Sequence, residues 1–130
     1  MKGLDTSVLL GLLEEDAAVR KLLGRLRGVE LATTEANLLE LELIAAHASG
    51  RQRKARRLAL ERLRRKITVL PIDARATDQV GSRLDPQAET LPPTALAMLG
   101  ALESNGCDEL FVRDPFPIEG RWRLRITNIE

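Results

Sequence analysis

Apolar residues along the chain follow two kinds of pattern that alternate with each other. Short apolar runs, which are typical of buried strands, lie at 1–4, 29–32, 67–70 and 110–112, and a stretch with period-two alternation covers 121–126. Between them, apolar residues recur every three or four positions, which predicts helices. A cap at Thr6 or Ser7 should open the first helix. The predicted helices cover residues 7–13, 17–26, 34–48, 51–66, 74–84 and 94–103.

Strands that alternate with helices favour an α/β fold with a mostly parallel sheet and helices on both of its faces. With 130 residues the chain has the size of a single domain, residues 1–130. In sheets of this kind, ligands bind in the crevice beyond the carboxyl ends of the strands. We therefore look for candidate functional residues directly after the predicted strands.

The composition is that of a globular protein, with 44% apolar and 30% charged residues. No apolar run reaches the roughly 18 residues that a membrane span needs. The opening segment meets an acid at Asp5, which is unlike a secretory signal. The single cysteine, Cys107, excludes an internal disulfide and a cysteine metal cage. We expect a cytoplasmic protein with no membrane partner.

The net charge of +1 hides an uneven distribution of charge along the chain. Residues 51–66 carry nine Arg or Lys against the single acid Glu61. This helix is either a solvated face or a surface for RNA phosphates or an acidic partner. The apolar residues of this helix that we expect to be buried are Ala55, Leu58, Ala59 and Leu63.

Two aspartates follow predicted strands directly. Asp5 comes after the strand at 1–4, and Asp114 comes two residues after the strand at 110–112. Both would lie at carboxyl ends of strands, where α/β folds place their ligands. The plain alternative is that each aspartate only caps a helix or stabilises a turn.

Glu40 lies in a predicted helix that is apolar nearly all round. At 100° per residue, Glu35 and Glu42 share one face, and Glu40 points roughly the opposite way. If the first two face water, Glu40 points inward, where a carboxylate is costly unless it is paired or bound to a metal. Its partner is then either a cation such as Arg113 or a divalent metal ion.

Four segments resemble the conserved blocks of the PIN domain family. Residues 4–10 are similar to the opening of these domains, where an aspartate ends the first strand, and residues 31–41 are similar to the second block, which supplies a glutamate. Residues 94–99 and 106–114 resemble the third and fourth blocks. The order and spacing agree across nearly the whole chain.

The resemblance implies a three-layer α/β/α sandwich with a central parallel sheet and hydrolysis of RNA phosphodiester bonds. Asp5, Glu40 and Asp114 match the family's catalytic positions, where carboxylates hold Mg²⁺ or Mn²⁺. Many small members, the VapC-like ones, are toxins that pair with an antitoxin protein, and many form homodimers. RNA, an antitoxin and a second copy are thus the expected partners.

Position 94 departs from the family's pattern, because Thr94 stands where the family usually has an aspartate. Its hydroxyl brings no charge, so we expect weak metal binding and reduced nuclease activity. Thr6, Asn37 and Thr94 are candidates for outer contacts to the metal ligands or the phosphate. Two other functions stay open: a catalytically degenerate PIN fold that binds RNA or protein, and an α/β domain whose acids form salt bridges.

Overall fold

The computed structural model describes residues 1–114, 118 and 121–129. Within these ranges the chain forms a five-stranded sheet with the strand order β3-β2-β1-β4-β5. Every neighbouring pair is parallel, as the sequence predicts. The strands are β1 (Lys2–Leu4), β2 (Leu31–Thr34), β3 (Thr68–Leu70), β4 (Glu109–Val112) and β5 (Arg125–Asn128).

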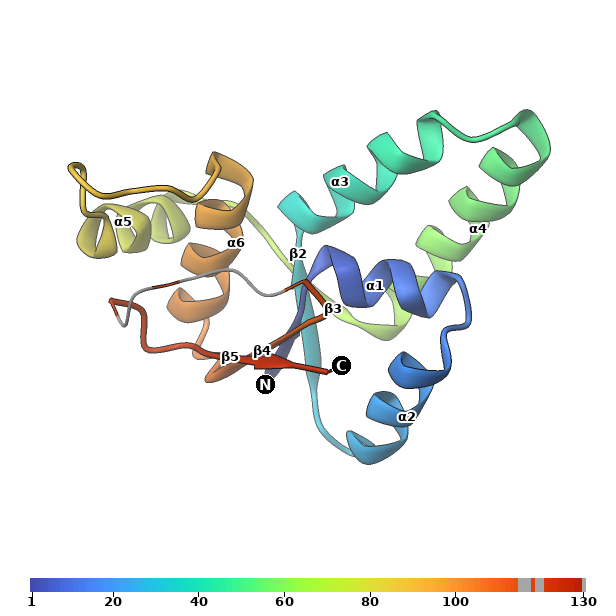
Figure 1. Ribbon diagram of the computed structural model, residues 1–130, viewed down its shortest axis with the longest axis horizontal. Coiled ribbons are helices and arrows are strands. Elements are labelled where there is room, and N and C mark those ends of the chain that lie inside the picture. Colours follow the sequence, from blue (N-terminus) through green and yellow to red (C-terminus); the bar gives the residue numbers. More distant parts are fainter. Residues whose placement is uncertain (115–117, 119–120, 130) are drawn as a thin grey trace.

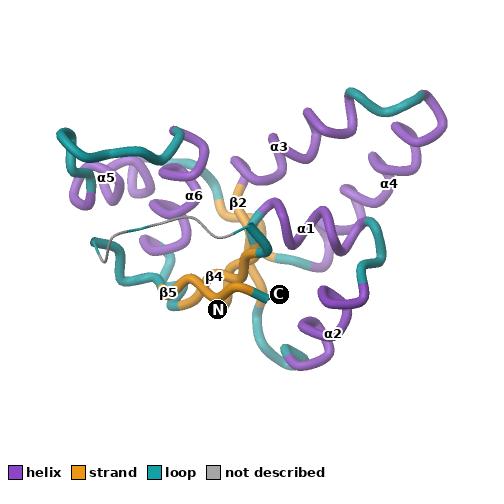
Figure 2. The backbone as a smooth tube through the Cα atoms, viewed as in Figure 1, coloured by secondary structure: helices purple, strands orange, loops and turns teal. Residues whose placement is uncertain are grey.

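Helices cover both faces of this sheet, which gives the expected α/β/α sandwich (Figure 1). They are α1 (Thr6–Leu13), α2 (Ala17–Arg25), α3 (Glu35–Ala46), α4 (Gly50–Lys66), α5 (Ala74–Arg83) and α6 (Pro93–Ser104). Figure 2 shows α5 and α6 on one side of the strands and α1, α2 and α4 on the other. Among the described helices, none combines the length and the apolar character that crossing a membrane would require.

Two hydrophobic cores fill the spaces between these layers. On the α5–α6 side, buried side chains include Leu99, Leu102 and Leu110. On the opposite side, Leu4, Val8 and their neighbours from α2, α3 and α4 pack together. Complete burial of one such side chain stabilises the fold by about 1.5–3 kcal/mol, so these cores fix where the strand ends and helix starts lie.

Two strands have different bounds in the structure from those that the sequence predicts. The strand predicted at 29–32 is Leu31–Thr34, so Thr33 and Thr34 belong to the strand and Thr34 caps α3. The strand predicted at 121–126 is Arg125–Asn128. Trp122 is buried, as the alternation indicates. The pairing of β5 with β4 nevertheless starts only at Arg125, which lies opposite Glu109, the first residue of β4. Alternation records which side chains are buried and not which backbone has a partner.

The buried stripe predicted for α4 is also partly wrong. Leu63 is buried, but Leu58 is 48% exposed and Ala55 is exposed, while Leu60 joins the core. The reason is that only the carboxyl half of α4 reaches the sheet, whereas its amino half extends outward together with α3 (Figure 1).

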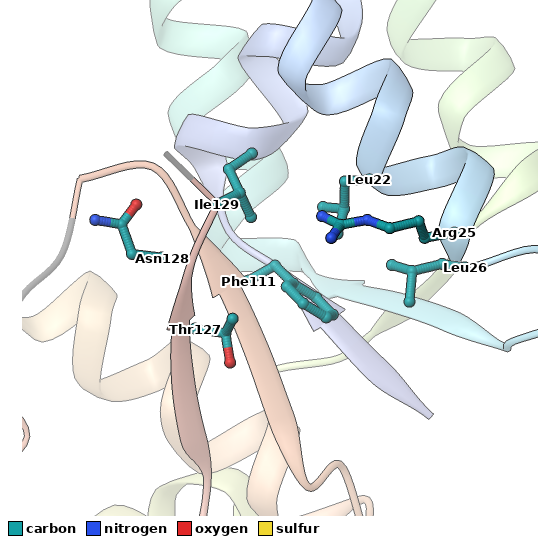
Figure 3. Close-up of a pocket in the computed structure, with 7 residues that line it drawn as sticks. All are labelled: Leu22, Arg25, Leu26, Phe111, Thr127, Asn128 and Ile129. Carbon is teal, nitrogen blue, oxygen red and sulfur yellow. The ribbon is translucent and has the colours of Figure 1, made fainter.

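A cavity of about 400 Å³ lies at the β5 edge of the sheet (Figure 3). Its walls come from α2, the ring of Phe111 and the end of β5, and Arg25 extends along it. No carboxylate is among its described lining residues, which are Leu22, Arg25, Leu26, Phe111, Thr127, Asn128 and Ile129. With Arg25 and no acid among these residues, this cavity lacks the negative charge that attracts a divalent cation.

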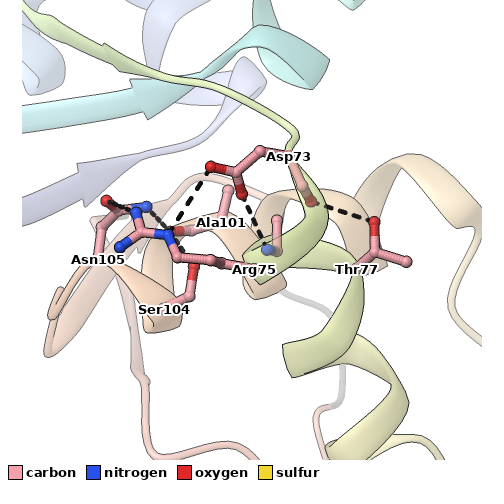
Figure 4. A network of polar contacts seen from close by, with 7 residues as sticks. Asp73, Arg75, Thr77, Ala101, Ser104 and Asn105 are labelled. Carbon is pink, nitrogen blue, oxygen red and sulfur yellow. Dashed lines mark hydrogen bonds and ion pairs between the residues drawn. The ribbon is translucent and has the colours of Figure 1, made fainter.

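A polar network holds α5 against α6 (Figure 4). Asp73 caps α5 by accepting a hydrogen bond from the backbone N–H of Ala76 at 3.1 Å. Arg75 donates to Asn105 Oδ1 at 2.8 Å, and Asn105 in turn donates to the carbonyl of Ala101 at 2.7 Å. A side chain at Gly100 would collide with the carbonyl of Ala76, so glycine permits this close approach. The network fixes α6, whose amino end borders the candidate site.

Candidate active site

A cavity of about 340 Å³ contains all six residues that the sequence singles out. It lies where β1, β2 and β4 end and where α1, α3 and α6 approach one another. The six residues are Asp5, Thr6, Asn37, Glu40, Thr94 and Asp114. The remaining lining residues are Ser7, Leu10, Ile44, Pro92, Ala95 and Met98. Residues up to 109 positions apart in the sequence thus share one concave surface, because parallel strands end at the same edge of the sheet.

Asp5 ends β1 and also caps α1. Its Oδ1 atom accepts hydrogen bonds from the backbone N–H of Val8 at 3.0 Å and from Ser7 Oγ at 2.6 Å. The cap is therefore Asp5, and not Thr6 or Ser7 as the sequence suggested, because Asp5 has the extended backbone of a helix cap. Asp5 can both cap the helix and line the cavity, because these two hydrogen bonds use only its Oδ1 atom.

Asp5 is also electrostatically unusual. Burial, and then the negative charge of Asp114, raise the pKa of the Asp5 carboxyl, although its hydrogen bonds from Ser7 and Val8 act in the opposite direction. The side chain is 7% exposed. Such a carboxylate gains from a nearby cation, which would offset both the burial and the repulsion by Asp114.

Ser7 is a residue of the site whose contacts the sequence did not reveal. Its hydroxyl donates to Asp5 and accepts from the backbone N–H of Arg113 at 2.9 Å. This contact ties the start of α1 to the end of β4 and so links Asp5 to the segment that carries Asp114. No local pattern signals it, because the two partners are 106 residues apart.

Glu40 points into the cavity, as the helix geometry predicts. It is half-buried, while Glu42 is exposed and Glu35 binds Arg64 at the surface at 2.9 Å. The carboxylate of Glu40 accepts a hydrogen bond from Thr6 Oγ1 at 3.0 Å. The cationic partner considered for Glu40, Arg113, instead forms an ion pair with Asp16 at 3.3 Å.

Thr94 and Asp114 are exposed residues of the cavity wall, as is Pro92. Thr94 follows Pro93 in the first turn of α6, a helix that starts without a side-chain cap. Amide N–H groups at a helix start lack partners within the helix and carry partial positive charge. This end of the cavity is therefore suited to an anion, whereas Asp5 and Glu40 are suited to a cation.

The donor set fits a hard divalent cation. The described lining residues include three carboxylates and several hydroxyls but no Lys, Arg or His. Among the described residues, however, no group of three or more His, Cys, Asp or Glu side chains is placed to hold a metal ion. Because Mg²⁺ needs only one or two carboxylates together with water and phosphate oxygens, the set fits with fewer than three carboxylates bound at once.

The single cysteine, Cys107, and the single histidine, His47, lie away from this chemistry. Cys107 is buried, and burial raises the pKa of its thiol to about 11, so it stays protonated and unreactive at neutral pH. His47 is exposed at the carboxyl end of α3 and does not line the cavity.

Solved structures share this fold at low sequence identity. The DNA-bound VapBC from Salmonella typhimurium is 17% identical over 98% of this chain and 97% of that chain, with a TM-score of 0.82. VapBC-5 from Mycobacterium tuberculosis is 23% identical over 98% and 97%, with a TM-score of 0.72. The sarcin-ricin loop cleaving toxin VapC20, also from Mycobacterium tuberculosis, is 18% identical over 85% and 87%, with a TM-score of 0.63.

None of the curated protein sequences matches the chain. The sequence model of the PIN domain, in contrast, matches residues 3–96, which is well over half of the 130 residues. The matched range includes most of β1, all of α3 and the start of α6, and so it contains Asp5, Glu40 and Thr94. The chain belongs to the PIN domain family.

Proposed function

We propose that this protein is a metal-dependent ribonuclease that hydrolyses RNA phosphodiester bonds. The observation that carries the proposal is the cavity of about 340 Å³, called the acid cavity from here on, whose lining includes Asp5, Glu40 and Asp114 and no described basic residue. Membership of the PIN family and the likeness to a sarcin-ricin loop cleaving toxin support the same chemistry.

Asp5, Glu40 and Asp114 are the residues that would hold Mg²⁺ or Mn²⁺. When bound, the ion would activate water and offset negative charge on the phosphate. Val8 and Ser7 fix one oxygen of Asp5, which orients its carboxylate toward the cavity. The amino end of α6 would receive a phosphate oxygen through its backbone amides.

Thr94 lowers the activity in this proposal. Its neutral hydroxyl lines the cavity but gives a divalent ion none of the attraction that a carboxylate gives. The chain would therefore bind metal weakly and cleave RNA slowly. The second candidate, a PIN fold that only binds RNA or protein, rests on this same residue.

We further propose that the protein is a cytoplasmic toxin with a cognate antitoxin, and that it forms a homodimer. Several similar structures are toxin–antitoxin complexes by their descriptions, including one from Klebsiella pneumoniae. For RNA binding, α4 offers exposed basic residues such as Arg51, Lys54 and Arg65. Multiple cations along one helix attract a polyphosphate chain in a salt-dependent way.

Cleavage of a mixed RNA substrate in Mn²⁺ tests the proposal. The native protein should cleave, and Asp5→Asn should abolish the cleavage while leaving the fold intact. Asp73→Asn is the matched control, because Asp73 also caps a helix but lies outside the acid cavity. Cleavage that survives in Asp5→Asn, or that is absent from the native protein, would contradict the ribonuclease proposal. RNA binding without cleavage would favour the second candidate.

A further inference from the structure

A continuous chain of side-chain hydrogen bonds leads from the end of β2 into the acid cavity. Thr34 Oγ1 donates to Asn37 Oδ1 at 2.6 Å, and Asn37 Nδ2 donates to Thr6 Oγ1 at 3.1 Å. Thr6 Oγ1 then donates to Glu40 Oε1 at 3.0 Å. The chain thus joins β2, α3 and α1 and ends on a carboxylate of the cavity.

The donor and acceptor in each of these hydrogen bonds follow from the number of N–H or O–H hydrogens that each group carries. Thr34 Oγ1 accepts the backbone N–H of Asn37 as the cap of α3, so its single proton is available for Asn37 Oδ1. The amide nitrogen of Asn37 must then face Thr6 and Met98 Sδ, which are both acceptors. Because Thr6 Oγ1 accepts a hydrogen bond from Asn37, its own O–H donates to Glu40.

The first two residues of this hydrogen-bond chain, Thr34 and Asn37, are buried. Thr34 is 0% exposed and Asn37 is 2% exposed, so water cannot readily replace either partner. A buried amide is costly when its hydrogen bonds are missing. A leucine has the same branching but makes none of these bonds, so the amide is explained by the bonds it makes and not by packing alone.

We propose that Asn37 is a positioning residue that acts through Thr6 to hold the Glu40 carboxylate in one orientation toward the cavity. The inference rests on the proposed function, in which Glu40 binds the metal ion. Asn37 itself touches neither the ion nor the substrate in this account. It sets the direction of the Thr6 hydroxyl, and that hydroxyl fixes the Glu40 oxygen.

The orientation of Glu40 can be measured without metal. Three-bond scalar couplings in the metal-free protein should report one χ1 rotamer for Glu40 in the native protein and in Thr6→Ser, which keeps the hydroxyl. Asn37→Leu and Thr6→Val should give couplings averaged over several rotamers. Thr127→Val removes an equally half-buried hydroxyl bond, to Glu109, and should leave Glu40 unchanged. A single Glu40 rotamer in both Asn37→Leu and Thr6→Val would overturn the proposal.

Metal affinity supplies a second test of the same route. Calorimetric titration with Mn²⁺ should show about 10–100-fold weaker binding for Asn37→Leu and for Thr6→Val, the loss typical of outer partners of metal ligands. The double variant should bind no more weakly than Thr6→Val alone, because Asn37 acts through Thr6. Fully additive losses would show that Asn37 acts by another route.

The two proposals can fail separately. If the native protein binds no Mn²⁺, the proposed function is wrong, while the couplings of Glu40 still decide whether Asn37 orients it. If Asn37→Leu does not fold, Asn37→Ala repeats the test with a side chain that cannot clash, and the Thr6 variants provide the comparison.

Discussion

Two aspartates that follow strands occupy very different surroundings in this protein. Asp5 and Asp73 both cap a helix, and both accept a hydrogen bond from a backbone N–H three residues ahead. At the α5–α6 junction, Arg75 lies 3.8 Å from Asp73 and also binds Asn105. In the acid cavity, the described neighbours of Asp5 include the like charge of Asp114 and no Lys, Arg or His in the lining.

The difference separates a structural aspartate from a candidate metal ligand. Asp73 is half-exposed and has a cation beside it, so its charge is satisfied within the fold. Asp5 is buried and lies near another acid, so its charge is best satisfied by a cation from solution. A helix cap and a metal ligand can thus be the same residue, and the surroundings distinguish the two cases.

The largest expected effect is on metal binding. Asp5→Asn should weaken Mn²⁺ binding by at least about 10–100-fold, since even changes to outer partners of a metal ligand cost that much. Asp73→Asn should leave the affinity unchanged. Calorimetric titration measures both, and equal affinities for the two variants would remove the distinction between the two aspartates.

The next largest effect concerns Thr94, the residue that we expect to weaken metal binding in the acid cavity. Thr94→Asp should tighten Mn²⁺ binding by about 10-fold or more, because it adds an anionic ligand at the place where the family usually has one. Thr94→Ala should change the affinity little. If the native and aspartate forms bind alike, position 94 lies outside the metal site.

The raised pKa of Asp5 predicts an effect of pH on the metal-free protein. Between the ordinary aspartate pKa of about 3.9 and the higher pKa in the fold, the folded state binds more protons than the unfolded state. Stability therefore falls as pH rises through this window. Relative to the native protein, Asp5→Asn should gain stability at neutral pH and lose that gain as the pH falls toward about 3.9.

Urea unfolding over a pH series measures this difference. Saturating Mn²⁺ should reverse it, because the native protein would gain about 2.7 kcal/mol at an ion concentration 100 times the dissociation constant. If the metal-free native protein became more stable relative to Asp5→Asn as the pH rises, the ionised Asp5 carboxylate would be stabilising, and its surroundings would not be those described here.

The smallest effect belongs to the α5–α6 junction. Arg75→Gln removes the ion pair with Asp73 at a side chain that is 64% exposed, so it should cost less than about 1 kcal/mol. Mn²⁺ affinity should stay the same. A larger loss of stability would show that this ion pair is stronger than an exposed one usually is. Any change in Mn²⁺ affinity would show that the junction and the cavity are coupled through α6.

The sequence predicted that Asp5, Glu40 and Asp114 lie near one another better than it predicted the hydrogen bonds between distant segments. Asp5 and Asp114 follow strands, and parallel strands end at one edge of a sheet, so their meeting in one cavity follows from the pattern. The inward direction of Glu40 follows from helix geometry, since Glu35 and Glu42 occupy the outer face.

Side-chain contacts between distant segments could not be predicted from strand and helix patterns. The bond from the Arg113 backbone to Ser7 joins residues 106 positions apart, and the direction of the Thr6 hydroxyl depends on Asn37, 31 positions away. The pattern favours Thr6 or Ser7 as the cap of the first helix and offers Asp5 only as the plain alternative; the extended backbone at Asp5 decides among them.

Crystals of the protein soaked in Mn²⁺, with the ion located by its anomalous scattering, test the central claim most directly. The account predicts a peak in the acid cavity, within bonding distance of a carboxylate oxygen of Asp5 and of at least one of Glu40 and Asp114. A cavity that stays without a peak at saturating Mn²⁺, or an ion bound only at other residues, would contradict it.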